Sequence, residues 1–136
     1  MSTYLVTGGA GFIGCNYVDR LLGRGEQVIL YDNLSRLGAE ENLAWLRERY
    51  GPKSFELAIA DVRDAAALRV AVEGVDVVVH LAGQTAVTTS VEDPRSDFEQ
   101  NAWGTFNVLE AARRVQTPPI VLYSSTNKVY GGMEDV

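Results

Sequence analysis

Cysteine, histidine and long apolar runs are scarce in this sequence of 136 residues. The single cysteine, Cys15, excludes a disulfide within the chain and leaves a zinc site without thiolate partners, so we expect no metal site. No apolar run approaches the roughly 18 residues of a membrane span. The first residues contain neither the basic region nor the apolar core of a secretory signal, and we expect a cytoplasmic protein.

Positively charged residues are also few, because the sequence has 12 lysines and arginines but 18 aspartates and glutamates, which gives a net charge of −6. This balance argues against a nucleic-acid or anionic-membrane surface, since both need clustered lysine and arginine. It does not exclude a small anionic ligand, which backbone N–H groups alone can bind. The length suits one domain, residues 1–136, and a hydrophobic content of 46% is ordinary for a globular fold.

Short apolar runs alternate with helical patterns along the whole sequence. Most of the apolar runs are continuous, as in strands buried on both faces of a parallel sheet; they lie at 4–6, 28–31, 55–59, 77–79 and 120–123. Between these runs, apolar residues recur at helical spacing and predict four helices. Their apolar residues are Gly14, Tyr17, Val18, Leu21 and Leu22; Ala39, Leu43, Leu46 and Tyr50; Leu68 and Ala71; and Phe98, Ala102, Phe106 and Leu109. Asp64 and Asp93 are the expected N-caps of the last two helices.

This alternation predicts an α/β fold, a Rossmann doubly wound parallel sheet with strand order 3-2-1-4-5. Ligands bind such sheets at the carboxyl ends of the strands, near the switch between the first and fourth strands. The sixth strand that is usual in this fold is not found before residue 136. We therefore expect the N-terminal portion of a longer protein, with a naturally short domain as the alternative.

A glycine-rich turn joins the first predicted strand to the first predicted helix. Gly8, Gly11 and Gly14 are spaced G-x-x-G-x-x-G, which permits a tight turn, a close approach of backbone to phosphate, and close packing of helix on strand. The N-terminus of the helix then offers free N–H groups and a partial positive charge. A plain turn would explain the glycines alone, but their place between strand and helix favours a dinucleotide pyrophosphate.

An acidic residue at the end of the second predicted strand adds independent support. Asp32 lies 18 residues after Gly14, where a carboxylate accepts hydrogen bonds from the hydroxyls of an adenosine ribose. A carboxylate there repels a 2′-phosphate, so NAD is favoured over NADP. Arg36 complicates this interpretation, because an arginine can accept the 2′-phosphate.

Several motifs, in this order, resemble the extended short-chain dehydrogenases/reductases, the NAD-dependent nucleotide-sugar epimerases and dehydratases. The motifs lie at 7–14, 31–35, 61–64, 80–83, Asn101 with Gly104-Thr105, 123–125 and 129–131. Within this family, the stretches 33–36, 42–46, 82–90, 97–99 and 124–131 are similar to the subfamily of CDP-paratose 2-epimerases. The resemblance covers the whole chain and implies that the full-length protein binds NAD and a nucleotide sugar, with a CDP-sugar favoured.

The resemblance also implies roles for individual residues. Those expected to hold NAD are Gly8, Gly11, Phe12, Ile13 and Gly14 at the pyrophosphate; Asp32, Asn33, Ser35 and Arg36 at the adenosine; Asp61 and Val62 at the adenine; and Leu81, Ala82, Gly83, Asn101 and Ser124. Thr126 matches the catalytic Ser/Thr, which bonds the reacting sugar oxygen. Thr88, Thr89 and Ser90 are expected in a loop that faces the sugar, and a polar loop without a ligand is nearly as good an explanation.

The implied reaction is a transient oxidation of the sugar to a ketone, followed by return of the hydride. Its base is a tyrosine in a Tyr-x-x-x-Lys motif, and no tyrosine of this sequence has lysine four residues later. We therefore expect the chain alone to bind NAD and to turn over nothing. The alternatives are a 4-epimerase, a 4,6-dehydratase and a non-catalytic NAD-binding domain.

Four further features are given no catalytic role. His80 ends a buried strand and is expected to brace a loop rather than to act in catalysis, and Lys128 is assigned no catalytic role. Cys15 is expected to be a small buried helix residue. The resemblance implies a homo-oligomer of the full-length protein through the helix that starts near Pro94, whose uncovered apolar face favours association.

Overall fold

The computed structural model describes residues 1–126. Five parallel strands form one sheet in the order β3-β2-β1-β4-β5, which confirms the predicted Rossmann topology. The strands are β1 (Thr3–Thr7), β2 (Gln27–Asp32), β3 (Glu56–Ile59), β4 (Val77–His80) and β5 (Ile120–Tyr123). The predicted motif at 129–131 and Lys128 lie outside the described residues.

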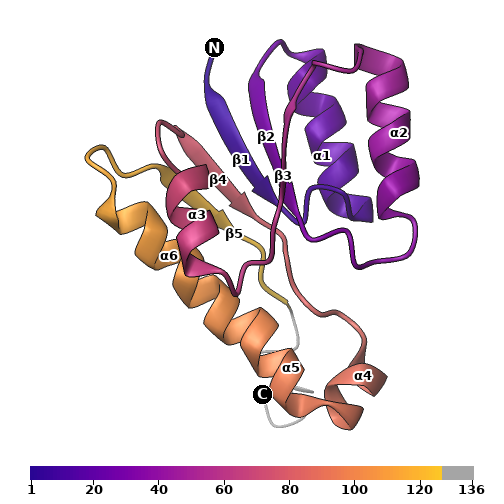
Figure 1. Cartoon of the computed structure of the whole chain (residues 1–136), viewed down its shortest axis with the longest axis vertical. Helices are drawn as coiled ribbons and strands as arrows, with labels where there is room; N and C mark the ends of the chain where they lie inside the picture. The colour runs from indigo at the N-terminus through magenta and orange to yellow at the C-terminus, as the bar shows by residue number, and fades with distance from the viewer. Residues whose placement is uncertain (127–136) are drawn as a thin grey trace, which may run out of the picture.

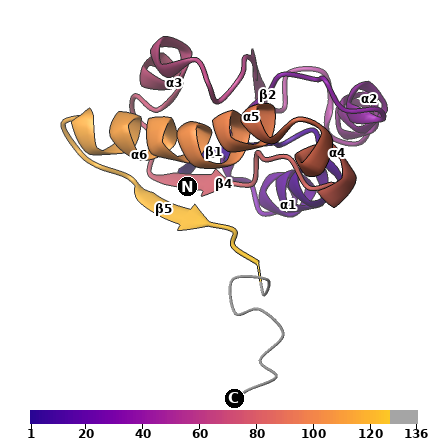
Figure 2. The same cartoon turned by 90° about the horizontal axis from the view of Figure 1, so that it is seen from below.

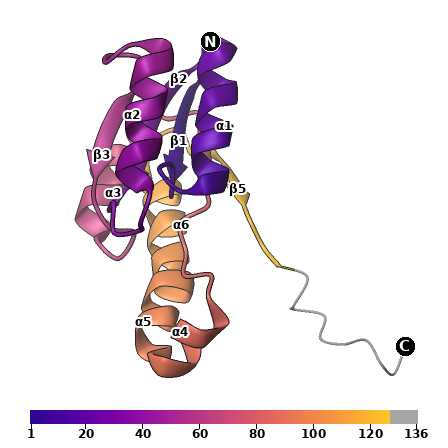
Figure 3. The same cartoon turned by 90° about the vertical axis from the view of Figure 1, so that its right-hand side faces the viewer.

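Helices cover the two faces of the sheet in pairs (Figures 1 and 3). On one face lie α1 (Phe12–Gly23) and α2 (Ala39–Tyr50), and on the other lie α3 (Ala65–Ala71) and α6 (Gly104–Arg114). Because side chains alternate along a strand, Val6 faces α1 while its neighbour Leu5 faces the opposite core. Each central strand is therefore apolar on both faces, as the continuous apolar runs predicted.

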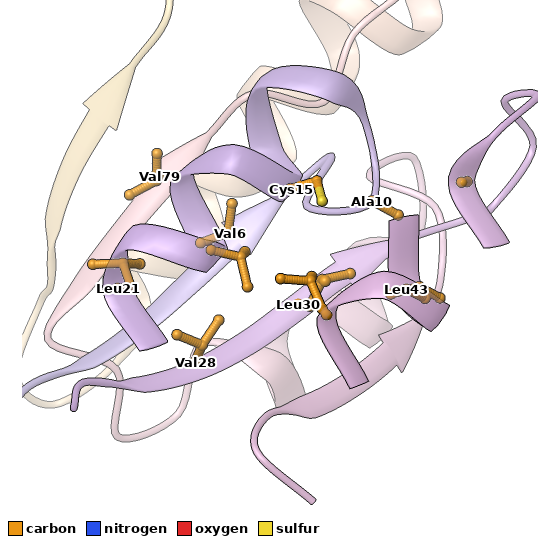
Figure 4. Close-up of a cluster of buried hydrophobic side chains, with 11 residues drawn as sticks. Val6, Ala10, Cys15, Leu21, Val28, Leu30, Leu43 and Val79 are labelled. Carbon is orange, nitrogen blue, oxygen red and sulfur yellow. The ribbon is translucent and has the colours of Figure 1, made fainter. Parts of the chain in front are cut away.

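The core between α1, α2 and the sheet contains the predicted helical stripes (Figure 4). Val18 and Leu21 of α1 and Leu43 and Leu46 of α2 are buried against the strands. Cys15 is buried among them with a pKa raised chiefly by that burial, in agreement with its predicted packing role. This core fixes α1 on the sheet and thereby fixes the glycine turn that precedes it.

Both predicted aspartate caps are present. The Asp64 carboxylate accepts the N–H groups of Ala66 and Ala67 at the start of α3. Asp93 accepts the N–H of Ser96, with Pro94 in the first turn of α5 (Pro94–Phe98). The two caps start the helices that carry the chain back across the sheet.

The region between β4 and α6 differs from the prediction in two ways. Residues expected to form a loop instead form a short helix, α4 (Val87–Glu92), because Ala86 and Thr89 carbonyls accept the N–H groups of Ser90 and Asp93. The helix expected to run on from Pro94 contains a π-helical turn, η1 (Glu99–Trp103), between α5 and α6. Figure 2 shows α5 and α6 in one line, and Figure 3 shows that this line runs on beyond the ends of the strands.

The outer side of that line of helices is apolar and exposed. Phe98, Phe106 and Leu109, which the sequence assigns to one side, are 62%, 50% and 48% exposed. The opposite side of α6 packs on the sheet through Val108 and Ala111. In the part of the chain from residue 1 to 126, no helix is long and apolar enough to span a membrane.

Candidate functional site

A pocket of about 430 Å³ lies at the carboxyl ends of β1, β2, β3 and β4. Loops that are far apart in the sequence meet there, as expected at the switch point of a doubly wound sheet. The lining residues are Gly8, Gly11, Tyr31, Asp32, Asn33, Ser35, Arg36, Ala60, Asp61, Val62, Leu81, Ala82, Gly83, Gln84, Ala86, Thr89 and Gln100. Eleven of the residues predicted to hold NAD are among them: Gly8, Gly11, Asp32, Asn33, Ser35, Arg36, Asp61, Val62, Leu81, Ala82 and Gly83.

The glycine turn is shaped by close contacts of the backbone with itself. Gly8 has a φ of +67°, which favours glycine, and a Cβ there would lie 2.8 Å from the Ala82 nitrogen. A Cβ on Gly14 would lie 2.1 Å from the carbonyl oxygen of Gly8, so α1 can approach the turn only without one. Gly9 is not one of the three glycines of the predicted spacing, but a side chain is excluded there too, because a Cβ would lie 2.6 Å from the Leu30 side chain.

Gly11 differs from the other glycines of the turn, because its role is not internal packing. A Cβ there would meet only the Gly8 oxygen at 3.2 Å, and Gly11 borders the pocket. Gly11 is also the N-cap of α1, and among residues 1–126 no side chain caps that helix. The first N–H groups of α1 therefore stay available to an anion near Gly11.

Asp32 stands at the end of β2 with its carboxylate bridging two loops. One oxygen accepts the N–H of Ala10 at 3.0 Å, and the other accepts the N–H of Leu34 at 2.8 Å. These two bonds orient the carboxylate, and each oxygen keeps capacity for a further donor. The arrangement suits a ligand that offers a pair of hydroxyl groups.

The residues after Asp32 form a polar wall. The Asn33 side-chain oxygen accepts both the N–H and the hydroxyl of Ser35, at 3.1 and 2.7 Å. Arg36 donates from Nη2 to the Thr85 hydroxyl at 2.9 Å, which joins the loop after β2 to the loop after β4. The guanidinium of Arg36 is thus engaged across the pocket and points to the β4 side.

Asp61 forms the wall beyond β3. Its carboxylate accepts hydrogen bonds from Arg63 and Asn33, and the Arg63 guanidinium is the main reason that the pKa of Asp61 is lowered to about 2. The hydroxyl of Tyr31 donates to the Asp61 carbonyl at 2.8 Å, and burial together with nearby carboxylates raises the pKa of Tyr31. Tyr31 therefore serves as a neutral hydrogen-bond donor inside the wall.

A buried chain of hydrogen bonds runs from β1 through His80 to α6. The Thr7 hydroxyl oxygen accepts the N–H groups of Leu81 and Ala82, each at 3.2 Å, and lies 2.6 Å from Nδ1 of His80. Nε2 of His80 lies 2.9 Å from the Thr105 hydroxyl. Since Thr7 already accepts two N–H groups, its proton is directed to Nδ1, and Nε2 of His80 carries the ring proton.

Burial of this ring lowers the pKa of His80 to about 4, so it is neutral near pH 7. His80 is 2% exposed and does not line the pocket. Its contacts hold the start of the loop that does line the pocket, in agreement with the bracing role predicted for it.

Asn101 supplies a second brace for the same loop. Its side-chain oxygen accepts the N–H of Gln84 at 2.8 Å, and its amide donates to the Gln84 carbonyl and to Asp97. Asn101 lies in the π-helical turn, and its own carbonyl accepts the Thr105 hydroxyl at 2.6 Å. The polar contact expected of a mid-helix asparagine is present, and it is made to the loop after β4.

The remaining predicted site residues, except Thr89, lie outside the pocket lining. Phe12 and Ile13 are exposed in the first turn of α1, and Gly14 is packed beneath it. Thr88 is exposed on α4, and the Ser90 hydroxyl bonds the Ala86 carbonyl, the Gln84 amide and the Asp97 carboxylate of α5. Thr89, from the same helix, does line the pocket.

Ser124 and Thr126 follow β5 and are exposed at the carboxyl end of the sheet. The N–H of Ser124 continues the pairing with β4 by donating to the His80 carbonyl at 3.4 Å. Their predicted roles toward cofactor and sugar stay predictions.

Sequence reasoning missed several residues of the pocket wall, namely Tyr31, Ala60, Gln84, Ala86 and Gln100. Tyr31 and Ala60 are the neighbours of the predicted residues Asp32 and Asp61, so their position at the strand ends could have placed them in the pocket wall. Gln100 comes from the π-helical turn, and no spacing rule places it near the glycine turn.

Comparison with known proteins agrees with this architecture. A family model described as GDP-mannose 4,6 dehydratase matches residues 5–136. The CDP-paratose 2-epimerase of Salmonella typhi is 44% identical over 132 residues, which cover 96% of this chain and 38% of that protein. The chain therefore spans about 38% of the length of this curated relative.

Solved structures give the same result. The UDP-glucose 4-epimerase of Thermus thermophilus, in complex with NAD, is 42% identical, with a TM-score of 0.71 over 82% of this chain and 34% of that one. The UDP-glucose 4-epimerase from Stenotrophomonas maltophila, with bound NAD and formylated UDP-arabinopyranose, has a TM-score of 0.85 at 28% identity. It matches 96% of this chain and 39% of its own.

Proposed function

The chain belongs to the GDP-mannose 4,6 dehydratase family of nucleotide-sugar epimerases and dehydratases, and on that premise we propose that its pocket binds NAD. The observation that carries the proposal is the meeting of the glycine turn, Asp32 and the loop after β4 around one pocket. Related epimerases of this fold were crystallised with NAD. The site offers what a dinucleotide needs, from ribose acceptors to a helix N-terminus for the pyrophosphate.

We assign the ends of the dinucleotide from the chemistry of the wall. Asp32, Asn33 and Ser35 hold the adenosine ribose, and Asp61 with Val62 flanks the adenine. The backbone at Gly8 and Gly11, with the first turn of α1, holds the pyrophosphate. Phe12, Ile13 and Gly14 form that first turn, and Arg36 belongs to the adenosine end. The remaining contacts proposed for the cofactor come from Leu81, Ala82, Gly83, Asn101 and Ser124.

NAD is preferred over NADP because the Asp32 carboxylate repels a 2′-phosphate. Arg36 would weaken that preference if its guanidinium were directed to the ribose. Its hydrogen bond to Thr85 supports the opposite, since it draws the guanidinium toward the β4 side of the pocket.

For the full-length protein we propose a nucleotide-sugar epimerase resembling CDP-paratose 2-epimerase, with a CDP-sugar as its substrate. Bound NAD supplies a reversible hydride acceptor for oxidation of the sugar. Thr126 then bonds the reacting sugar oxygen, and Thr88, Thr89 and Ser90 border the sugar. A 4,6-dehydratase is the second candidate, because the matching family model is described by that activity.

We further propose that the chain of residues 1–136 binds NAD without turning over a sugar, since its sequence contains no Tyr-x-x-x-Lys. This behaviour would equally describe a non-catalytic NAD-binding domain. Epimerisation of a CDP-sugar by the purified chain would exclude both.

The exposed apolar side of α5 and α6 supports a homo-oligomer of the full-length protein. Trp103 and Phe106 stack on that side at 5.2 Å between ring centroids, and each is about half exposed. A contiguous apolar surface of this kind marks an interaction site. Sedimentation of the full-length protein, with Phe106→Glu as the disrupting variant, tests the proposal.

Titration calorimetry of the purified chain with NAD⁺ and NADP⁺ tests the cofactor proposal. We expect NAD⁺ to bind more tightly, and Asp32→Asn to weaken NAD⁺ binding about 10- to 100-fold, as loss of charged hydrogen bonds of about 1.5–3 kcal/mol implies. Asp76→Asn is the matched control, because the Asp76 carboxylate also accepts a backbone N–H, that of Thr3, but at the amino end of the sheet. Equal effects of the two substitutions, or no binding by the wild type, would contradict the proposal.

A further inference from the structure

Arg63 lies behind the wall of the pocket and not in it. It follows β3 and borders a separate hollow of about 470 Å³, together with Arg95, Phe98, Glu99 and Trp103. Its guanidinium reaches back to the Asp61 carboxylate, which does line the pocket. The guanidinium of Arg63 thus contacts the lining of the pocket through Asp61.

Arg63 supplies most of the hydrogen bonds that the Asp61 carboxylate receives. Oδ1 of Asp61 accepts Nε and the backbone N–H of Arg63, each at 2.9 Å, and Oδ2 accepts Nη2 at 2.8 Å. Such a two-point pair fixes the plane of a carboxylate as well as its charge. Nη1 of Arg63 also lies 3.8 Å from Glu99, which ties the pair to the π-helical turn.

The fourth bond to this carboxylate has a different character. The Asn33 amide donates to Oδ2 of Asp61 at 2.9 Å from an exposed side chain at the rim of the pocket. A carboxylate has about four acceptor positions, so these four bonds fill it. An N–H donor on a ligand can take the position of the Asn33 amide, and the three bonds from Arg63 then keep the carboxylate in place.

The backbone of the same wall is fixed independently of Arg63. Tyr31 holds the Asp61 carbonyl, and the buried Asn107 amide donates to the carbonyls of Val62 and Arg63 at 3.1 and 3.2 Å. Loss of the Arg63 side chain therefore removes the two-point pair and leaves the Asp61 carboxylate held by one backbone N–H and the Asn33 amide, without releasing the loop. This separation makes a specific effect on ligand recognition measurable.

We propose that Arg63 is a positioning residue that sets the preference of the site for adenine, by holding the Asp61 carboxylate as an acceptor for the 6-amino group. The inference rests on the proposed binding of NAD. A carboxylate accepts an amino group and repels a carbonyl oxygen at the same position. The site therefore discriminates between NAD⁺ and nicotinamide hypoxanthine dinucleotide, in which a carbonyl replaces the amino group.

The experiment is calorimetric titration of the chain with both dinucleotides. We expect the wild type to bind NAD⁺ about tenfold or more tightly than the hypoxanthine dinucleotide, as one hydrogen bond to a charged group implies. Arg63→Gln should weaken NAD⁺ binding about tenfold and leave binding of the analogue nearly unchanged, so that the ratio approaches one. Arg63→Lys keeps the positive charge but loses the planar guanidinium, so its ratio of affinities should lie between those of the wild type and Arg63→Gln.

Arg113→Gln is the matched control, because Arg113 forms a similar pair with Glu110 on α6, away from the pocket. Thermal melting of every variant separates lost recognition from lost folding, and Arg63→Lys serves if Arg63→Gln does not fold. An unchanged ratio in both Arg63 variants, or equal weakening for both dinucleotides, overturns the role of Arg63 alone. Absence of NAD⁺ binding by the wild type overturns the proposed function, and this inference with it.

Discussion

Acidification from pH 7 to pH 5 should destabilise the folded chain through His80. The folded state holds this ring neutral with a pKa of about 4, because burial disfavours its charged form. The unfolded state takes up the proton near the ordinary value of 6.5. Between these values the unfolded state binds more protons, so the free energy of unfolding falls as the pH falls.

The size of the effect follows from the two pKa values. One pKa unit corresponds to about 1.4 kcal/mol, so the full difference is about 3 kcal/mol, and about 2 kcal/mol of it is lost between pH 7 and pH 5. His80 is the only histidine in the sequence. No second imidazole therefore contributes between pH 7 and pH 5.

Urea unfolding at pH 7, 6 and 5, followed by tryptophan fluorescence, measures the effect. His80→Asn should cost about 1–3 kcal/mol at pH 7 through its broken hydrogen bonds, yet flatten the pH dependence. Thr105→Val is the control, because it removes one partner of the ring and keeps the titrating group. A wild-type stability that does not change from pH 7 to 5, or an equal slope in His80→Asn, would refute the reasoning.

Two further substitutions test the packing that shapes the site. Gly14→Ala should lower the free energy of unfolding by about 1–3 kcal/mol, as overpacking does, because its Cβ would lie 2.1 Å from the Gly8 oxygen. Gly23→Ala, at the end of the same helix, is the control and should be nearly neutral in the same urea titration. Asn107→Leu should cost about 1–3 kcal/mol by leaving the Val62 and Arg63 carbonyls without their donor. A melting temperature equal to that of the wild type in either variant would count against the packing argument.

The sequence predicted the fold because the relevant signals are local and strong. Continuous apolar runs such as residues 77–79 indicate parallel strands, and the caps at Asp64 and Asp93 mark where helices begin. Right-handed crossovers then leave a few strand orders for this sequence of elements, the glycine turn after the first strand favours the Rossmann order among them, and the sheet has that order. The helix at 87–92 was missed, because no periodic apolar stripe distinguishes it from a loop. Residues 99–103 were predicted as helix, but their π-helical geometry was not, because the apolar spacing there is that of an ordinary helix.

The sequence predicted the residues of the candidate site that lie at strand ends, and it missed the residue from the π-helical turn. Residues at strand ends, such as Gly8, Asp32 and Asp61, were found because the topology sends the carboxyl ends of parallel strands to one edge. Gln100 was not found, because the π-helical turn that brings it to the pocket depends on contacts between Asn101 and the loop at Gln84. Such contacts join segments that no short-range pattern connects.

By itself the sequence determined the sheet, the glycine turn and the acidic residue after β2, since each follows from backbone geometry and the spacing of residue types. Only the tertiary structure decided what each side chain does once the loops meet. The neutral state of His80 comes from burial between Thr7 and Thr105, and the fixed carboxylate of Asp61 comes from Arg63 on its far side. Burial and charge pairing are properties of the folded chain, because they depend on where the fold places the side chains relative to one another.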